Sequence, residues 1–293
     1  IGLVGSEMCI RDRGDAISTT SELVKISSDG NLGLEEGQKF ERGGIYRFTV
    51  DVTKGNTKAV LTVEKVGKVD LPAPDIFFGN DKMEVTDTDI YKSEQLFTQG
   101  QMITVTGIDN LNEWWIDPDF FEKQSDGALK FLPINGDYRV TANAVLKYFS
   151  VMALKDGKPA KLQDDGTGAI WAIGKGIGKP SVTSSEVGWE PGKALCLAQV
   201  APKKYQLTLK AGETLKTSGD WEAISFKFFY QNDWGGEFGN YANSILVEQL
   251  KLTDSGNLEM QDNKAFEEGA VYRFTIDVTN GNANADLKVE KIN

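Results

Sequence analysis

The residues best suited to chemistry gather between positions 221 and 241, where tryptophan, tyrosine, amide and carboxylate side chains alternate with glycines. This mixture suits a ligand that has an apolar face and a rim of hydroxyl groups, because aromatic rings pack on C–H bonds while polar groups exchange hydrogen bonds. A sugar ring is such a ligand. With one further tryptophan, the candidate contacts are Trp189, Lys227, Tyr230, Asn232, Asp233, Trp234 and Tyr241.

The sequence of residues 224–230 predicts a β-strand, since it is rich in aromatic and β-favouring side chains. This strand would carry part of the cluster and position the rest. Phe226, Phe228 and Tyr230 would share one face of the strand and enter a core, whereas Lys227 would lie on the opposite face beside an aromatic neighbour. That opposite face is therefore the one expected to meet a ligand.

Each tryptophan is expected either to stay exposed as a flat surface for a ligand, called a platform, or to be buried in the core. Trp234 follows the strand in a glycine-rich loop, where it would either stay exposed or fold back over the core. Trp189 occupies a turn-rich segment and is a second platform candidate. Trp171 lies among isoleucines and is expected to be buried. At most one of the neighbours Trp114 and Trp115 can be core, because successive residues of an extended chain point to opposite faces.

Composition excludes several classes of function. The net charge is −11, which argues against a nucleic-acid partner, and there is no histidine, which excludes serine-type triads and histidine metal sites. The acidic loops at 87–89 and 164–167 lack the ligand spacing of a calcium site and are interpreted as turns. We therefore expect no histidine-dependent catalysis, and we predict no catalytic residue, no metal ligand set and no cofactor.

Two further segments have structural interpretations. Cys196 stands in an apolar run and is expected to be buried. The glycine-rich stretch 174–180 lacks the spacing of a phosphate-binding loop and is interpreted as a flexible turn leaving a strand.

An internal repeat organises the chain. Residues 26–66 and 252–292 align without a gap and are identical at about half of their positions. In the second copy, 272–278 alternates bulky and polar residues, Asn280-Gly281 supplies a turn, and 287–290 alternates again. Each copy therefore predicts a β-hairpin, which must belong to a larger β-domain because a lone hairpin is marginally stable in water.

We predict an all-β chain of tandem antiparallel β-sandwich domains. The first residues, including Met8-Cys9-Ile10-Arg11-Asp12, match a translated sequencing adaptor, and the first repeat copy lacks the residues that precede the second. The predicted segments are 1–13, adaptor; 14–69, C-terminal remnant of a truncated sandwich module; 70–158, middle immunoglobulin-like domain; and 159–293, C-terminal sandwich module.

The order of short motifs over about 165–293 resembles the carbohydrate-binding modules of SusE/SusF-type surface glycan-binding proteins. The motifs are Trp171-Ala172-Ile173-Gly174, Gly188-Trp189 with Pro191, Tyr205-Gln206-Leu207-Thr208, Phe226-Lys227-Phe228, Asn232-Asp233-Trp234-Gly235, Phe238-Gly239 and the closing run 269–278.

The resemblance implies non-catalytic binding of polysaccharide or oligosaccharide by a surface-exposed outer-membrane lipoprotein, as part of a glycan-uptake system. Its partners would be a glycan and an outer-membrane glycan-transport complex, with membrane contact only through a lipid anchor outside this fragment. The contacts it carries over are Trp189, Lys227, Tyr230, Asn232 and Trp234. Bulky residues at 229–231 and an acidic loop at 235–237 depart from the family pattern and leave the glycan's identity open.

Two other functions remain open at this stage. A glycoside hydrolase would need a pair of carboxylates across a cleft, and Glu222, Asp233 and Glu237 flank the aromatic cluster. A structural surface-assembly protein would use exposed tryptophan and tyrosine at a protein interface.

Overall fold

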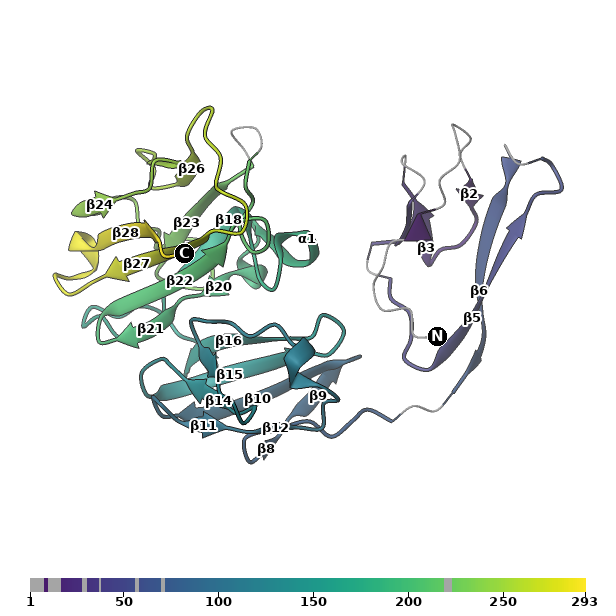
Figure 1. Cartoon of the computed structure of the whole chain (residues 1–293), viewed down its shortest axis with the longest axis horizontal. Helices are drawn as coiled ribbons and strands as arrows, with labels where there is room; N and C mark the ends of the chain where they lie inside the picture. The colour runs from purple at the N-terminus through teal and green to yellow at the C-terminus, as the bar shows by residue number, and fades with distance from the viewer. Residues whose placement is uncertain are drawn as a thin grey trace. The chain divides into compact units, whose positions relative to one another are not determined.

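The computed structural model describes residues 8–9, 17–27, 31–36, 38–55, 58–69, 72–218 and 223–293, which form β-strands joined by turns (Figure 1). The prediction of an all-β fold with antiparallel sheets is confirmed. Two compact units are present, one of residues 1–74 with 87–89 and one of residues 75–86 with 90–293. Within the described ranges, no helix has the length and apolarity needed to cross a bilayer.

The first unit contains two small sheets. One has the order β2-β6-β5 and the other the order β1-β4-β3. The strands are β1 (Met8–Cys9), β2 (Ser18–Thr19), β3 (Val24–Ile26), β4 (Asn31–Leu34), β5 (Gly44–Asp51) and β6 (Val60–Lys68). β1 pairs with β4 although it lies in the segment interpreted as adaptor, and that interpretation stays a prediction.

The last five strands of the chain repeat β2–β6 in order and pairing. They are β24 (Asn243–Ile245), β25 (Leu250–Leu252), β26 (Leu258–Met260), β27 (Val271–Asp277) and β28 (Asp286–Lys291). In each copy the first strand runs parallel to the fifth, and the second and third, like the fourth and fifth, are antiparallel. The hairpin predicted from the repeat is therefore present twice.

The two copies differ in what covers them. Phe274 and Ile276 are fully buried, whereas Val50, the counterpart of Ile276, is 46% exposed. In the second unit, β22 (Lys204–Lys210) pairs with the free edge of β27, and Phe226 of β23 (Ser225–Phe229) packs on Phe274 with ring centroids 5.5 Å apart. In the described part of the first unit, β5 pairs only with β6.

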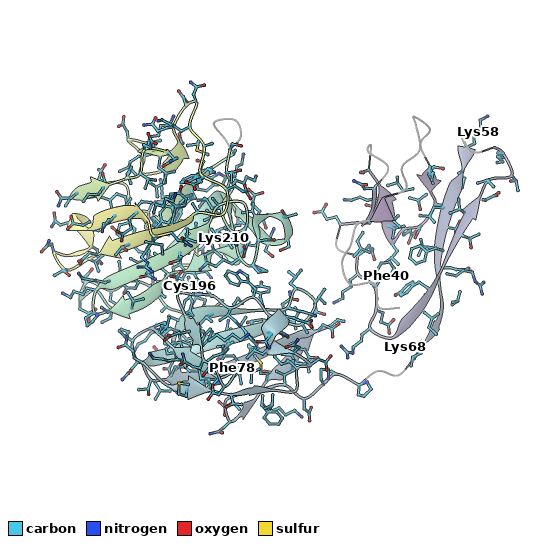
Figure 2. The ribbon with its side chains drawn as sticks, in the orientation of Figure 1. Phe40, Lys58, Lys68, Phe78, Cys196 and Lys210 are labelled. Atoms are coloured by element: carbon cyan, nitrogen blue, oxygen red, sulfur yellow. The ribbon has the colours of Figure 1, made fainter. Side chains whose placement is uncertain are left out.

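The middle domain is built around aromatic residues. Its large sheet has the order β17-β16-β15-β10-β9, and two three-stranded sheets have the orders β11-β14-β13 and β12-β7-β8. Phe78 contacts Phe97 and Phe149 of the large sheet, so the layers meet at one core, which Figure 2 shows filled with side chains. The strands are β7 (Phe77–Phe78), β8 (Asp81–Lys82), β9 (Glu84–Asp87), β10 (Ile90–Phe97), β11 (Met102–Ile103), β12 (Val105–Thr106), β13 (Phe121–Lys123), β14 (Leu129–Phe131), β15 (Gly136–Asn143), β16 (Tyr148–Lys155) and β17 (Lys158–Pro159).

The C-terminal module is a sandwich of two sheets. One has the order β19-β18-β23-β26-β25, with β20 also on β18, and the other has the order β21-β22-β27-β28-β24. Trp171 and Cys196 are buried, as predicted. The new elements are β18 (Trp171–Gly178), α1 (Val182–Ser185), β19 (Glu186–Gly188), β20 (Leu195–Cys196) and β21 (Ala198–Ala201).

The prediction of a flexible turn at 174–180 is wrong, because β18 continues to Gly178 as a buried strand. Gly174 adopts a φ of 141°, and a Cβ atom there would lie 2.4 Å from the carbonyl oxygen of Ser225. The glycines of this stretch therefore serve close contact between strands, which the sequence pattern does not distinguish from a loop.

A buried ion cluster joins the middle domain to the C-terminal module within the second unit. Lys179 Nζ lies 2.8 Å from Asp117 Oδ2 and 3.1 Å from Asp119 Oδ2. The backbone N–H and the hydroxyl of Thr208 also donate to Asp119, each over 2.6 Å. Near this cluster, Trp115 donates from Nε1 to Glu213. As predicted for neighbouring tryptophans, only Trp114 enters the core.

Candidate functional site

The candidate site begins where β23 ends. The N–H of Tyr230 donates to the carbonyl of Gly236 over 2.7 Å, and the N–H of Phe238 donates to Phe228 over 3.0 Å, so the intervening residues form a closed loop. Gly235 and Gly236 have φ values of 82° and 69°, a left-handed conformation that glycine adopts without steric cost. This pair of glycines turns the chain back along β23.

The turn brings Trp234 onto Phe229, with ring centroids 6.0 Å apart and planes at 74°. Trp189, which enters from the segment after β19, stacks on Trp234 with centroids 6.3 Å apart and planes at 26°. Trp234 is 50% exposed, Trp189 is half-buried and Phe229 is buried. We call these three residues the aromatic platform; Trp234 supplies its exposed ring.

Lys227 shares a strand face with Phe229, as the sequence pattern predicts, and it is half-buried opposite Ile173 of β18. The expected exposure of the aromatic on this face is wrong for Phe229, because Trp234 covers it. The face therefore carries Lys227 and, two residues further along the strand, Phe229 with Trp234 packed on it.

Two polar residues continue the loop. The carboxylate of Asp233 is exposed and accepts a hydrogen bond from the N–H of Trp234 over 2.8 Å. Asn232 Oδ1 is buried, and no donor in the described part of the chain reaches it. A buried amide oxygen without a donor is costly, so this atom is suited to a hydroxyl from a ligand or a water.

Tyr230 and Tyr241 belong to a second group around Phe238. Tyr230 meets Phe238 edge to face at 4.3 Å, and Tyr241 stacks on the same ring at 5.8 Å. Burial raises the pKa of Tyr241, and in the described residues its hydroxyl has no hydrogen-bond partner. Among these residues no ring contact connects either tyrosine to Trp234, so the predicted set of seven divides into two groups.

Sequence reasoning missed Asn282 in this second group. Its backbone carbonyl accepts a 3.5 Å hydrogen bond from the hydroxyl of Tyr230, and its Nδ2 donates to Gln163 over 3.0 Å. Its Oδ1 is buried and receives no donor from the described residues. The available signal was the Gly281-Asn282 turn of the repeat, which was interpreted only as a hairpin connection.

The described acidic residues near the platform lie on exposed surface. Asp233 and Glu237 are both exposed, and Glu237 forms an antiparallel bridge with Phe229 through its backbone. Glu222 lies outside the described residues. Glycoside hydrolysis requires two carboxyl groups at a defined separation across a cleft, and the two described candidates both lie on exposed surface.

The fold and the platform define a tandem β-sandwich protein with an exposed aromatic surface. The chain belongs to the family described as Domain of unknown function (DUF5121), whose model matches residues 8–53 and 165–279. Residues 57–162 match the family described as Domain of unknown function (DUF5125). The two domain types therefore occur in tandem, and the first match begins inside the segment interpreted as adaptor. No curated protein matches the chain.

Proposed function

We propose that the C-terminal module binds polysaccharide or oligosaccharide without catalysis, at the surface of the outer membrane, as part of a glycan-uptake system. The observation that carries this proposal is the exposed ring of Trp234, which stacks on Trp189 and meets Phe229 at a steep angle. A solvent-exposed indole held by two other aromatic rings keeps its orientation without a ligand, so stacking a sugar costs little conformational entropy.

Polar groups close to the ring suit the hydroxyl rim of a sugar. Asn232 offers a buried acceptor, Asp233 an exposed carboxylate and Lys227 an ammonium group on the supporting strand. A glycan fits this combination better than a protein partner, which would be expected to cover a larger apolar area than one ring. The surface location, the lipid anchor and the transport complex follow from the SusE/SusF resemblance and are part of the proposal.

Affinity electrophoresis of residues 70–293 through gels that contain soluble polysaccharides tests the proposal. We expect one glycan to retard the protein and Trp234→Ala to abolish the retardation, because removing a stacked aromatic anchor costs about 1–3 kcal/mol of binding. Trp234→Tyr is the matched control and should retain part of the retardation, since it keeps an aromatic face. Equal migration of Trp234→Ala and the parent protein would contradict the proposal.

The alternatives have their own readouts. Release of reducing ends during prolonged incubation with the retarding glycan, lost in Asp233→Asn or Glu237→Gln, would establish a hydrolase. Association with a protein partner that soluble oligosaccharide does not displace would establish an assembly role.

A further inference from the structure

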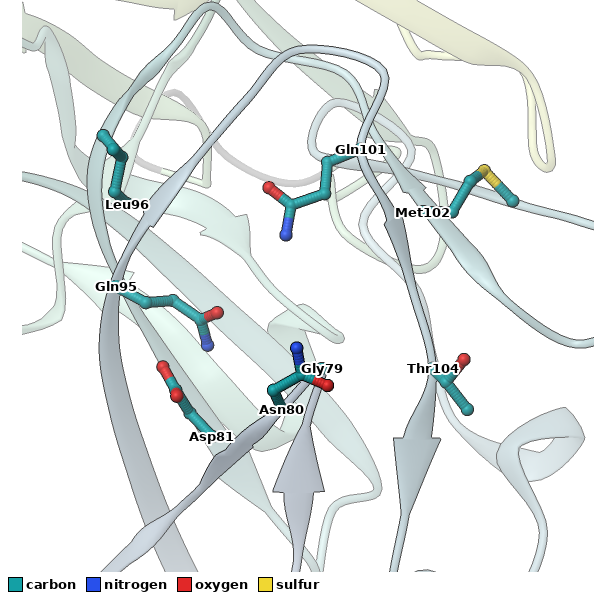
Figure 3. Close-up of a pocket in the computed structure, with 8 residues that line it drawn as sticks. All are labelled: Gly79, Asn80, Asp81, Gln95, Leu96, Gln101, Met102 and Thr104. Carbon is teal, nitrogen blue, oxygen red and sulfur yellow. The ribbon is translucent and has the colours of Figure 1, made fainter.

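A hollow lies on the surface of the middle domain. It is open to solvent and has a volume of about 400 Å³, beside the turn between β7 and β8 (Figure 3). Figure 3 shows the amides of Asn80, Gln95 and Gln101 turned towards the same space, with the carboxylate of Asp81 beside Gln95. The lining residues are Gly79, Asn80, Asp81, Gln95, Leu96, Gln101, Met102 and Thr104.

Backbone contacts fix the walls of this hollow. The N–H of Gly79 donates to the carbonyl of Thr104 over 2.9 Å, which ties the turn after β7 to the segment that enters β12. Gly79 adopts a φ of 67°, a left-handed conformation that favours glycine. Below the hollow, Phe78 and Ile103 belong to the buried core. The hollow is therefore a feature of the folded domain rather than of a loose loop.

Hydrogen bonds also fix two of the amides. Gln95 donates from Nε2 to the carbonyl of Phe78 over 3.1 Å and to the hydroxyl of Ser93 over 2.8 Å, so both of its hydrogens are used. Gln101 instead accepts at Oε1 from the N–H of Thr98 over 3.0 Å. Within the described chain, Gln95 Oε1 remains as an acceptor and Gln101 Nε2 remains as a donor.

A fixed acceptor and a fixed donor match two hydroxyl groups of one ligand, one donating and the other accepting. Asn80 adds a second donor and acceptor, and Asp81 adds a carboxylate. No lysine or arginine lines the hollow, so an anionic ligand such as a phosphate would meet a negative charge and no compensating cation. The chemistry favours a neutral ligand with several hydroxyl groups.

We propose that this hollow binds a neutral sugar residue, as a site separate from the aromatic platform. The hollow would bind the sugar through hydrogen bonds to amides that are already oriented, whereas the platform would bind a sugar by stacking. The proposal does not rest on the function of the C-terminal module, because its residues and its domain are different.

Saturation-transfer NMR on the full chain tests the proposal, with glucose, galactose, mannose, xylose, maltose and cellobiose as probes. The measurements use the Trp234→Ala background, so no signal comes from stacking on the exposed ring of the platform. We expect transfer to at least one probe. Gln101→Leu, which removes the donor, should weaken it at least tenfold, and Thr104→Trp, which fills the hollow, should abolish it.

Gln124→Leu is the matched control, since it makes the same change at a half-buried position on the β13–β14 turn, and it should leave the signal unchanged. Melting temperatures of all variants establish that each is folded. Absence of transfer in the Trp234→Ala background would show that the hollow holds only water. Transfer that persists in Thr104→Trp would place the sugar elsewhere, and either result overturns the proposal.

Discussion

Lys179 and Asp117 come from different domains, and their side chains meet at 2.8 Å with only 6% and 8% of their surfaces exposed. Asp119, 3.1 Å from Lys179 Nζ, completes the cluster. Burial raises the pKa of Asp117. Burial opposes ionisation of Asp119 as well, but Lys179, Gln206 and Thr208 together hold the pKa of Asp119 below its usual value. The contact between the two domains therefore depends on the pairing of these buried charged groups.

Lys179→Met should lower the free energy of unfolding of the second unit by about 3–5 kcal/mol, because it leaves two buried carboxylates without a cation. Urea denaturation measures the change. Lys193→Met is the matched control: its ion pair with Glu190 is exposed, and its removal should cost no more than about 1 kcal/mol. Equal effects of the two variants would show that the buried cluster does not hold the junction.

The contributions of Asp117 and Asp119 to folding stability should change in opposite directions as the pH changes. Because the folded pKa of Asp119 is lowered, its stabilisation is present above the ordinary value of 3.8 and is lost as pH falls through the lowered pKa. The stability gap between the parent protein and Asp119→Asn should therefore narrow as pH falls from 6 to 2.

The folded pKa of Asp117 is raised, so its contribution is fully present below 3.8 and is lost as pH rises through the raised pKa. Asp117→Asn should therefore gain stability relative to the parent as pH rises over the same range. Urea titrations at several pH values measure both trends, and parallel curves for the two variants would contradict the assignment.

Trp171→Ala and Trp234→Ala should separate stability from binding. Trp171 is fully buried and donates to the carbonyl of Ala160 over 3.0 Å, so its truncation should cost about 3–5 kcal/mol. Trp234 is half exposed, and its truncation should cost about 1 kcal/mol or less. Thermal melts give both values. A large loss of stability for Trp234→Ala would mean that this ring is part of the core.

Gly174→Ala should destabilise the C-terminal module by at least about 2 kcal/mol, since the new methyl group would overlap the backbone of β23 in an unfavourable backbone conformation. Gly192→Ala, where nothing lies within 4 Å of the added carbon, should be close to neutral. Chemical denaturation compares the two, and a neutral Gly174→Ala would restore the interpretation of this stretch as a flexible turn.

The repeat provides a comparison within one chain. Phe274→Ala should cost about 3–5 kcal/mol, because the ring is buried against Phe226. Phe48→Ala, at the equivalent but half-buried position, should cost less than half as much. Native-state hydrogen exchange at the amides of β5 and β27 reads each hairpin separately. Equal losses would show that the first copy is covered as fully as the second.

Periodicity was sufficient to predict much of the fold. The alternation of bulky and polar residues in 272–278 correctly predicted the hairpin and its buried face. The apolar neighbours of Trp171 and Cys196 correctly predicted that both side chains are buried. These features depend on neighbouring residues in the sequence, which is the information that a pattern contains.

Features that depend on distant pairing were not predictable in the same way. The glycines of β18 have the composition of a loop, and their role in close strand contact is visible only where β23 lies against them. Asp117 and Lys179 are 62 residues apart in the sequence, and their pairing is visible only where the two domains meet. At the candidate site, the loop after β23 was found from its composition. The stacking of Trp189 on Trp234 and the separate grouping of Tyr241 required the folded chain.

The junction at Lys179 also has a mechanical consequence. A pulling force on the C-terminal module is transmitted to the middle domain through a buried ion cluster and a backbone contact from Ile134 to Gln199, in addition to the peptide that connects them. A contact of this kind should restrict bending between the two domains. We therefore expect the middle domain and the C-terminal module to resist tension and torsion together.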